Sequence, residues 1–406
     1  MKYIVCAFLV CSYGLGQAQS DTVNLSQTNI AYVYDLESPI RFESRVAMGE
    51  AEATVFLQVI NQRSGPVSVQ YEVRSAYQGG EVLLANPLSD QQLLKQENNR
   101  AYYRFTLPVT DESNYVFVYA QQTIEGVPQE FRYDIALNTD QNFPLTDLVL
   151  MQDEEDLPIF DDFVKEGTNF RIVSIYNQDS SAYLYYYSHD FEPNPPPMAS
   201  GGGDVQKSLE IDSLFRISLG ETLEFEKEGM YFVQTDTTSL SGLSFRVENE
   251  YYPRLVEIEN VIAPLRYIST SEEMDQLTEN TEPKKALDQY WLKMTRSQER
   301  AKEIIRHYYR QVTKANQLFT SYKEGWKTGQ GMIYVLYGQP DAVYRDNDRE
   351  TWVYNADRNL VDLSFTFSQV KNIFTHSYYN LVRDEDYKRF WYRNIDLWRK
   401  GRKEFE

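Results

Sequence analysis

The chain is poor in the residues that carry most redox, nucleophilic and metal chemistry. Among its 406 residues are only two cysteines and three histidines. Cys6 and Cys11 both precede a predicted signal-peptide cleavage site, so the mature chain would hold no disulfide and no thiolate metal site. His189, His307 and His376 have no zinc-ligand spacing to another ligand, which favours structural or surface histidines over a metal centre.

The motifs of several enzyme classes are also missing. There is no Gly-x-Ser-x-Gly nucleophile motif and no phosphate-binding or dinucleotide-binding glycine pattern. Ser200–Gly203 could offer backbone amides to an anion, but without a strand-to-helix context a flexible loop is favoured. The acidic runs Asp153–Asp156 and Asp161–Asp162 lack a glycine-punctuated calcium loop, which favours solvated charge over calcium binding. We therefore expect no cofactor and no metal. A glycosidase carboxylate pair is defined by a distance in space, so the sequence does not test for one.

Long apolar runs are lacking as well, because nothing after the first residues approaches the roughly 20 residues that span a bilayer. The first residues resemble an export signal, with Lys2, the mostly apolar Tyr3–Val10 and the small-residue site Gly16–Ala18. This pattern predicts a signal peptide over residues 1–18. The alternative is lipid attachment at Cys11, which the bulky residue before it disfavours.

Acidic residues and tyrosine, by contrast, are abundant. The formal net charge is -20, which argues against nucleic acid as a partner. The 32 tyrosines favour half-buried sheet surfaces and interfaces, where the hydroxyl stays wet.

Short alternating runs separated by turn residues fill the first 256 residues. The predicted strands of a first set are Ala53–Ile60, Val67–Val73, Ala101–Val109, Asn114–Ala120 and Phe131–Leu137. Those of a second set are Asn169–Tyr176, Ala182–Tyr187, Ser213–Ile217 and Gly229–Thr235. This spacing predicts two tandem antiparallel β-sandwich (Ig-like) domains, at 19–140 and 141–256, with one larger domain as the alternative. Pro193–Gly203 is predicted to be a mobile loop.

From about Ile262 the pattern changes to helices, which predicts an α+β domain over 257–406. The predicted helices are one from Ser271, Lys284–Met294, a long one at Ser297–Tyr322, and Asp384–Arg399. Gly325 is expected to end the long helix with a left-handed cap. The predicted strands are Met332–Tyr337, Thr351–Tyr354 and Leu363–Phe367.

The most distinctive stretch is Gly325–Gly331 followed by Tyr334–Asp341, which we interpret as turn, strand, turn. It resembles the motif of the GWxTD domain proteins. Further similar stretches are Pro264–Ser269, Tyr290–Trp291, Tyr308–Arg310, Ala315–Asn316 and Phe319. The resemblance implies a cell-envelope protein of a Bacteroidetes-type bacterium, and it implies no reaction. Gly329 stands where the motif has aspartate, and Gln330 where relatives usually carry a basic residue, so a function of that aspartate is in doubt here.

We predict that the motif maintains the fold, with docking as the alternative. Glycine, proline and aromatic residues are what a turn-bounded sheet needs, and Trp326 and Trp352 would be its core anchors. The candidate residues are Gly325, Trp326, Thr328, Gly331, Tyr337, Gly338, Pro340, Asp341, Trp352 and Tyr354.

The long helix carries the clearest surface pattern. Lys302, Arg306, Arg310 and Lys314 recur every four residues and so share one helix face, which we call the basic stripe. A solvated face, or docking against the chain's own acidic sandwiches, is favoured. The functional alternative is a site for an acidic partner or for lipid head groups.

The sequence favours an exported, non-enzymatic interaction or scaffold module of an outer-membrane or periplasmic assembly. Other envelope proteins would be its partners, and it would have no membrane span after signal removal, although it could associate peripherally with the outer membrane. The alternative is a hydrolase acting on envelope or extracellular polysaccharide, which a cleft with two convergent carboxylates of perturbed pKa would favour. A third hypothesis is a surface protein anchored through Cys11.

Overall fold

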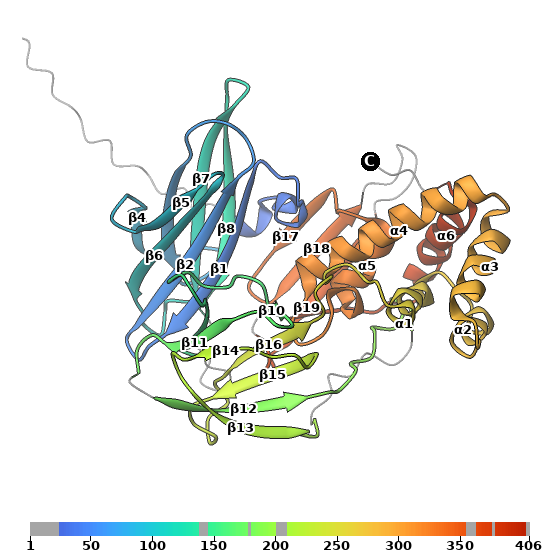
Figure 1. Ribbon diagram of the computed structural model, residues 1–406. Coiled ribbons are helices and arrows are strands. Elements are labelled where there is room, and N and C mark those ends of the chain that lie inside the picture. The colour runs from blue at the N-terminus through green and yellow to red at the C-terminus, as the bar shows by residue number, and fades with distance from the viewer. Residues whose placement is uncertain are drawn as a thin grey trace, which may run out of the picture.

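The computed structural model describes residues 24–137, 145–177, 180–199, 209–354, 363–375 and 378–402. The predicted signal peptide, both cysteines, the 140/141 domain boundary, Ser200–Gly203 and His376 lie outside these residues. Two sheet-rich regions pack beside a helix-rich region, as Figure 1 shows. The predicted mixed fold, sandwiches followed by an α+β region, is confirmed. None of the helices in the described ranges is both long and apolar enough to cross a membrane.

The first region, sandwich 1, consists of two four-stranded antiparallel sheets. Their orders are β1-β2-β6-β5 and β4-β3-β7-β8. The strands are β1 (Ile40–Met48), β2 (Glu52–Asn61), β3 (Ser68–Arg74), β4 (Val82–Pro87), β5 (Leu93–Glu97), β6 (Arg100–Pro108), β7 (Tyr115–Ile124) and β8 (Val127–Ala136). Alternate residues such as Val55, Leu57 and Val116 form the core between the sheets.

The second region, sandwich 2, pairs a five-stranded sheet with a three-stranded one. The orders are β10-β16-β15-β12-β13 and β14-β11-β9. The strands are β9 (Leu148–Gln152), β10 (Phe163–Lys165), β11 (Phe170–Ser174), β12 (Ser181–Tyr187), β13 (Ser213–Ser218), β14 (Thr222–Leu223), β15 (Gly229–Gln234) and β16 (Leu243–Glu248). β10 runs parallel to β16, so the prediction of a wholly antiparallel sandwich was wrong at this edge.

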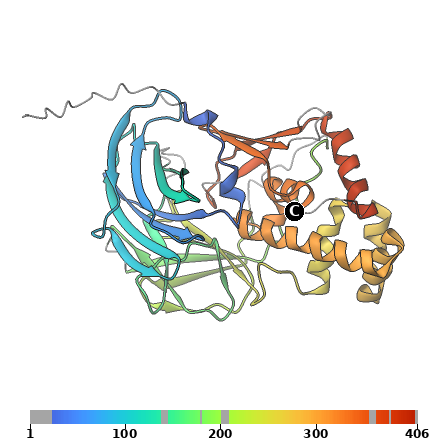
Figure 2. The ribbon, with the colours of Figure 1, turned by 90° about the horizontal axis from the view of Figure 1, so that it is seen from above.

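The third region packs helices against the antiparallel sheet β17-β18-β19-β20. Its helices are α1 (Ile258–Ile262), η3 (Ala263–Tyr267), α2 (Ser271–Thr278), α3 (Pro283–Thr295), α4 (Gln298–Phe319), η4 (Gly325–Lys327), α5 (Gly329–Tyr337) and α6 (Tyr387–Lys400). Its strands are β17 (Ala342–Arg345), β18 (Arg349–Tyr354), β19 (Leu363–Gln369) and β20 (Tyr379–Leu381). Figure 2 shows α4 running from the junction with the sandwiches to the helices at the far end of this region.

Three local predictions in this region were wrong. Met332–Tyr337 is not a strand but most of helix α5, because a short run buried on every side has no periodicity to distinguish strand from helix. α4 ends at Phe319, and the next residue, Thr320, is extended. Gly325 is not a left-handed cap but part of η4. The last helix begins at Tyr387 and not at Asp384.

The N-terminal segment joins the third region although it precedes sandwich 1. It contains η1 (Leu25–Gln27) and η2 (Ala31–Tyr34). The Ile30 amide donates to the Val343 carbonyl at 2.9 Å, and the Asn29 side chain accepts from the Val343 amide at 2.9 Å. Residues 29–34 thus border β17 and complete the core of a domain that begins more than 200 residues later.

Candidate functional site

Residues Gly325–Gly331 hold the start of α5 against the last turns of α4. A Cβ on Gly325 would come within 2.1 Å of the Ala315 carbonyl oxygen. A Cβ on Gly331 would come within 1.8 Å of the Gly325 carbonyl oxygen. Thr328 caps α5, since its hydroxyl accepts from the Gly331 amide at 2.9 Å and donates to the Gly325 carbonyl at 2.8 Å. Close backbone packing therefore excludes any side chain at both glycines.

Trp326 and its neighbours lie inside the domain. The indole is 2% exposed and meets the Tyr267 ring edge-on at 5.9 Å. Its backbone amide donates to Asn316 Oδ1 at 3.0 Å, and its carbonyl accepts from the Tyr267 hydroxyl at 2.9 Å. The residue thereby ties α4, η3 and η4 together.

The second half of the motif closes α5 onto the sheet. Gly338 ends the helix with φ of +84°, and its carbonyl accepts from the Tyr354 hydroxyl at 2.9 Å. Tyr337 packs against the Tyr354 ring at 5.4 Å. Pro340 is buried, whereas Asp341 is exposed and reaches β18 through its backbone amide.

Glu350 is the centre of a buried polar cluster that sequence reasoning missed. The carboxylate is fully buried and accepts from Tyr34 at 2.6 Å, from Trp352 Nε1 at 2.5 Å and from Gln330 Nε2 at 3.1 Å. Arg345 Nε donates to its other oxygen at 2.6 Å. The Gln330 amide thus supplies one of the donors to this carboxylate.

Arg345 extends this cluster into sandwich 1. Its Nη1 contacts Asp134 Oδ2 at 2.6 Å, an oxygen that also accepts from the Tyr77 hydroxyl at 2.5 Å. Burial would raise the pKa of Asp134, but the Arg345 charge and these hydrogen bonds hold it below its usual value. The ionised pair therefore joins the first sandwich to the third region.

Gly329 stands where the family motif has aspartate, and a loop of sandwich 2 lies against it. A Cβ on Gly329 would stand 3.0 Å from Asn194 Nδ2 and 3.2 Å from the Leu381 amide nitrogen. Asn194 Oδ1 accepts from Lys323 Nζ at 3.0 Å. Burial lowers the pKa of Lys323 to about 8. In this chain an asparagine of the loop occupies the space into which a side chain at the aspartate position would extend.

The described part of the predicted loop is anchored rather than detached. The Asn194 amide donates to the Lys327 carbonyl at 2.9 Å. Arg383 Nη1 donates to the carbonyls of Pro195 and Pro196 at 2.7 and 2.6 Å. Residues 193–199 are therefore part of the seam between sandwich 2 and the third region.

A buried charge network lies in the same seam. Arg246 of β16 pairs with Glu248 and approaches Glu324 at 3.9 Å, while Lys327 pairs with Glu324 at 2.9 Å and with Asp190. Burial raises the pKa of Glu248 to about 7. Burial also acts to raise the pKa of Glu324, but Arg246 and Lys327 outweigh it and lower that pKa.

The basic stripe lies on the outer face of α4. Lys302, Arg306 and Arg310 are exposed and Lys314 is half-buried. None of the four forms an ion pair with another residue in the described ranges. Burial and then the Arg310 charge lower the pKa of neighbouring His307.

The acidic runs predicted to be solvated are partly used in ion pairs. The pairs are Glu155 with Lys95 at 2.7 Å, Asp156 with Arg171 at 3.2 Å and Asp162 with Arg45 at 2.8 Å. Within the described part of the chain no three His, Cys, Asp or Glu side chains gather as a metal site.

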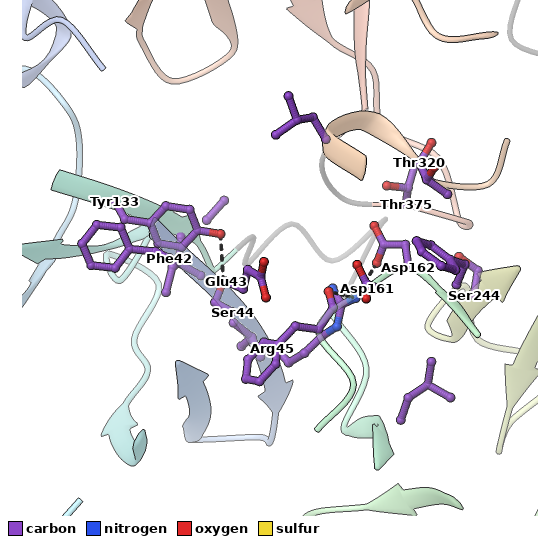
Figure 3. A pocket seen from close by; sticks show the side chains of 18 of the residues that line it. Phe42, Glu43, Ser44, Arg45, Tyr133, Asp161, Asp162, Ser244, Thr320 and Thr375 are labelled. Atoms are coloured by element: carbon purple, nitrogen blue, oxygen red, sulfur yellow. Dashed lines mark hydrogen bonds and ion pairs between the residues drawn. The ribbon is translucent and has the colours of Figure 1, made fainter. Parts of the chain in front are cut away.

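A cavity of about 420 Å³ opens where all three regions meet. Figure 3 shows Glu43 and Asp161 on facing walls, with Arg45 and Tyr133 nearby. Burial raises the pKa of half-buried Glu43, and it also raises the pKa of Asp161, although Asp161 is an exposed residue. Sequence reasoning missed Glu43, whose strand it did not predict, because only the fold brings it opposite Asp161.

These features define a class of protein: paired β-sandwiches fused to an α+β domain whose glycine-tryptophan motif is buried. The third region together with strands β15 and β16 is a GWxTD domain, since the model of that family matches residues 229–400. The match begins earlier than the resemblance had indicated, inside sandwich 2. No curated protein matches the chain.

Proposed function

We propose that the protein is an exported, non-enzymatic interaction module of the cell envelope. In this proposal it binds an acidic partner through the basic stripe of α4. The sandwiches and the GWxTD domain act as one rigid carrier for that surface, within a periplasmic or outer-membrane assembly.

The observation that carries the proposal is the position of positive charge on an acidic protein. Residues 257–406 hold 24 Lys and Arg against 23 Asp and Glu, whereas residues 1–256 hold 16 against 37. The stripe lies in the balanced part, and its exposed cations have no ion-pair partner among the described residues. Such a field attracts an acidic surface and orients it.

The contacts of the motif residues support a structural role for the motif. Gly325, Thr328 and Gly331 are used in the α4–α5 contact, and Trp326 and Trp352 are buried. The exposed stripe is then a better docking candidate than the motif itself.

The test reverses Lys302, Arg306, Arg310 and Lys314 to glutamate in the tagged full chain. Proteins that co-purify from the native envelope are identified at about 0.05 and 0.5 M salt, which shortens the Debye length severalfold. We expect the partner to be lost in the variant at both concentrations and to weaken in the wild type at high salt. Each exposed charge contributes only about 0–1 kcal/mol to stability, so the variant should stay folded.

The matched control reverses four exposed bases elsewhere, Arg63, Arg254, Lys284 and Arg349. It changes the net charge equally and should keep the partner. Equal recovery with all three proteins would leave the stripe an ordinary solvated face.

A hydrolase acting on polysaccharide is the second candidate. The observation that favours it is Glu43 and Asp161 in one cavity, both with raised pKa. Release of new reducing ends from envelope polysaccharide, abolished by Glu43→Gln and Asp161→Asn, would support it. If no reducing ends are released in this assay, the hydrolase hypothesis is wrong.

A further inference from the structure

Three side chains from neighbouring strands form one row on the outer face of sandwich 1. In register, Glu43 of β1 lies opposite Gln58 of β2, and Gln58 lies opposite Tyr102 of β6. Directly opposite residues project from the same face of a sheet. A carboxylate, an amide and a phenol therefore stand side by side.

Two members of this row have polar groups that the protein does not satisfy. Gln58 is 3% exposed and Tyr102 is 5% exposed. Neither side chain makes a hydrogen bond to any other residue that the structure describes. Neither polar end is among the fully buried unpartnered atoms, so the Gln58 amide and the Tyr102 hydroxyl remain accessible to a molecule in the adjoining hollow.

A hollow of about 560 Å³ covers the row, within the size range of small-molecule sites. Its opposite wall is the segment Pro158–Asp161 of sandwich 2, whose Phe160 ring lies 6.3 Å from the Tyr102 ring. The hollow shares Glu43 and Asp161 with the 420 Å³ cavity of Figure 3. The two spaces thus border the same two carboxylates, and we refer to them together as the groove.

The charge around the groove selects the kind of ligand. The 560 Å³ hollow is lined by two bases, Arg100 and Lys165, and by five acidic residues: Glu43, Asp153, Glu154, Glu155 and Asp161. Glu43 is paired with Arg41 at 3.2 Å. This acidic excess disfavours an anionic chain. Aromatic rings beside amide, phenol and carboxylate groups suit a ligand with both apolar faces and many hydroxyls.

We propose that this groove binds a neutral saccharide chain, with the Gln58 amide and the Tyr102 hydroxyl hydrogen-bonded to sugar hydroxyls. The carboxylates of Glu43 and Asp161 accept from hydroxyls at the middle of the chain. The site is separate from the basic stripe and does not depend on it. It shares its carboxylates with the second candidate function, but it concerns binding alone.

The test is calorimetric titration of the full chain with three neutral hexasaccharides: cellohexaose, xylohexaose and chitohexaose. Hexagalacturonate and spermidine serve as anionic and cationic probes. We expect millimolar or tighter binding of at least one neutral chain and weaker binding of the anionic one. Gln58→Leu and Tyr102→Phe should each weaken that binding about fivefold to tenfold, as the loss of one hydrogen bond to a buried group does.

Thermal unfolding separates lost binding from lost folding. Because Gln58 makes no side-chain hydrogen bond to another described residue, Gln58→Leu should unfold at the wild-type temperature or above it. The control Gln129→Leu, on the exposed face of β8, should leave both binding and unfolding unchanged. Reducing-end assays on the same mixtures show whether the bound chain is also cleaved, which decides the second candidate function independently.

Three results would overturn the proposal. The first is the absence of heat and of any unfolding shift with all three neutral chains at millimolar concentration. The second is binding of spermidine alone, which would make the groove a site for organic cations. The third is full binding by both variants, because the ligand would then lie elsewhere.

Discussion

The Glu350 cluster of the GWxTD domain and the Glu43–Gln58–Tyr102 row of sandwich 1 use their polar groups in opposite ways. In the cluster, the buried carboxylate of Glu350 accepts from four donors. In the row, the side chains of Gln58 and Tyr102 make no hydrogen bond to another described residue and face the 560 Å³ hollow. The satisfied cluster makes a rigid support, whereas the row offers its polar groups to a ligand.

The largest expected effect concerns the core of the rigid side. Trp326→Ala and Trp352→Ala should each lower the free energy of unfolding by roughly 3–5 kcal/mol, because each removes a buried indole and leaves a cavity. Trp352 is fully buried among Tyr34, Phe319 and Phe367. Urea unfolding of the full chain measures the loss.

Tyr392→Ala is the control for both tryptophans, since Tyr392 is 55% exposed on α6. It should lower the free energy of unfolding by much less than either tryptophan variant does. A variant that lost partner binding with unchanged unfolding would mean that the motif is a docking site and not a support.

The next effect concerns the junction of the two regions. Arg345→Met should cost roughly 3–5 kcal/mol, because it leaves Asp134 and Glu350 buried without their cation. Arg349→Met, at an exposed position of the neighbouring strand, is the matched control. If the Arg345–Asp134 ion pair couples the two regions, adding Asp134→Asn should restore part of the lost stability. An unchanged double variant would mean that the two regions are coupled by apolar packing instead.

The smallest effect is a pH dependence at the seam with sandwich 2. The pKa of Glu248 is raised to about 7 from an ordinary 4.5, so the folded state keeps a proton that the unfolded chain releases. The stability gained from that proton is complete below about pH 4.5 and is lost as the pH rises through 7. Glu248→Gln keeps an acceptor for Arg246. It should reduce the change in the free energy of unfolding over this pH range by on the order of 1–3 kcal/mol.

Urea midpoints between about pH 5.5 and 8 measure this slope. Glu250→Gln, at an exposed neighbouring position, should retain the wild-type slope. Parallel curves for wild type and Glu248→Gln would show that Glu248 ionises at its ordinary pH in the folded protein.

The sequence was most informative where burial is one-sided. Alternation located β2 and β7, and the three- and four-residue steps located α4 and its basic stripe. It failed for α5, because residues 329–336 are all buried and periodicity then carries no information. It also missed the long-range partners: Tyr34 and Glu350 are 316 residues apart, and the Glu43–Gln58–Tyr102 row exists only through strand register.

The N-terminal segment has a consequence for the order of assembly. The bonds of Asn29 and Ile30 to Val343 join the earliest described part of the chain to a strand that emerges some 300 residues later. The core of the GWxTD domain therefore stays open until nearly the whole polypeptide has emerged, and closing so long a loop is slow. Until then the apolar side chains of Ile30 and Tyr34 have no core to enter. In the unfinished protein these side chains are exposed to water and depend on another surface to shield them.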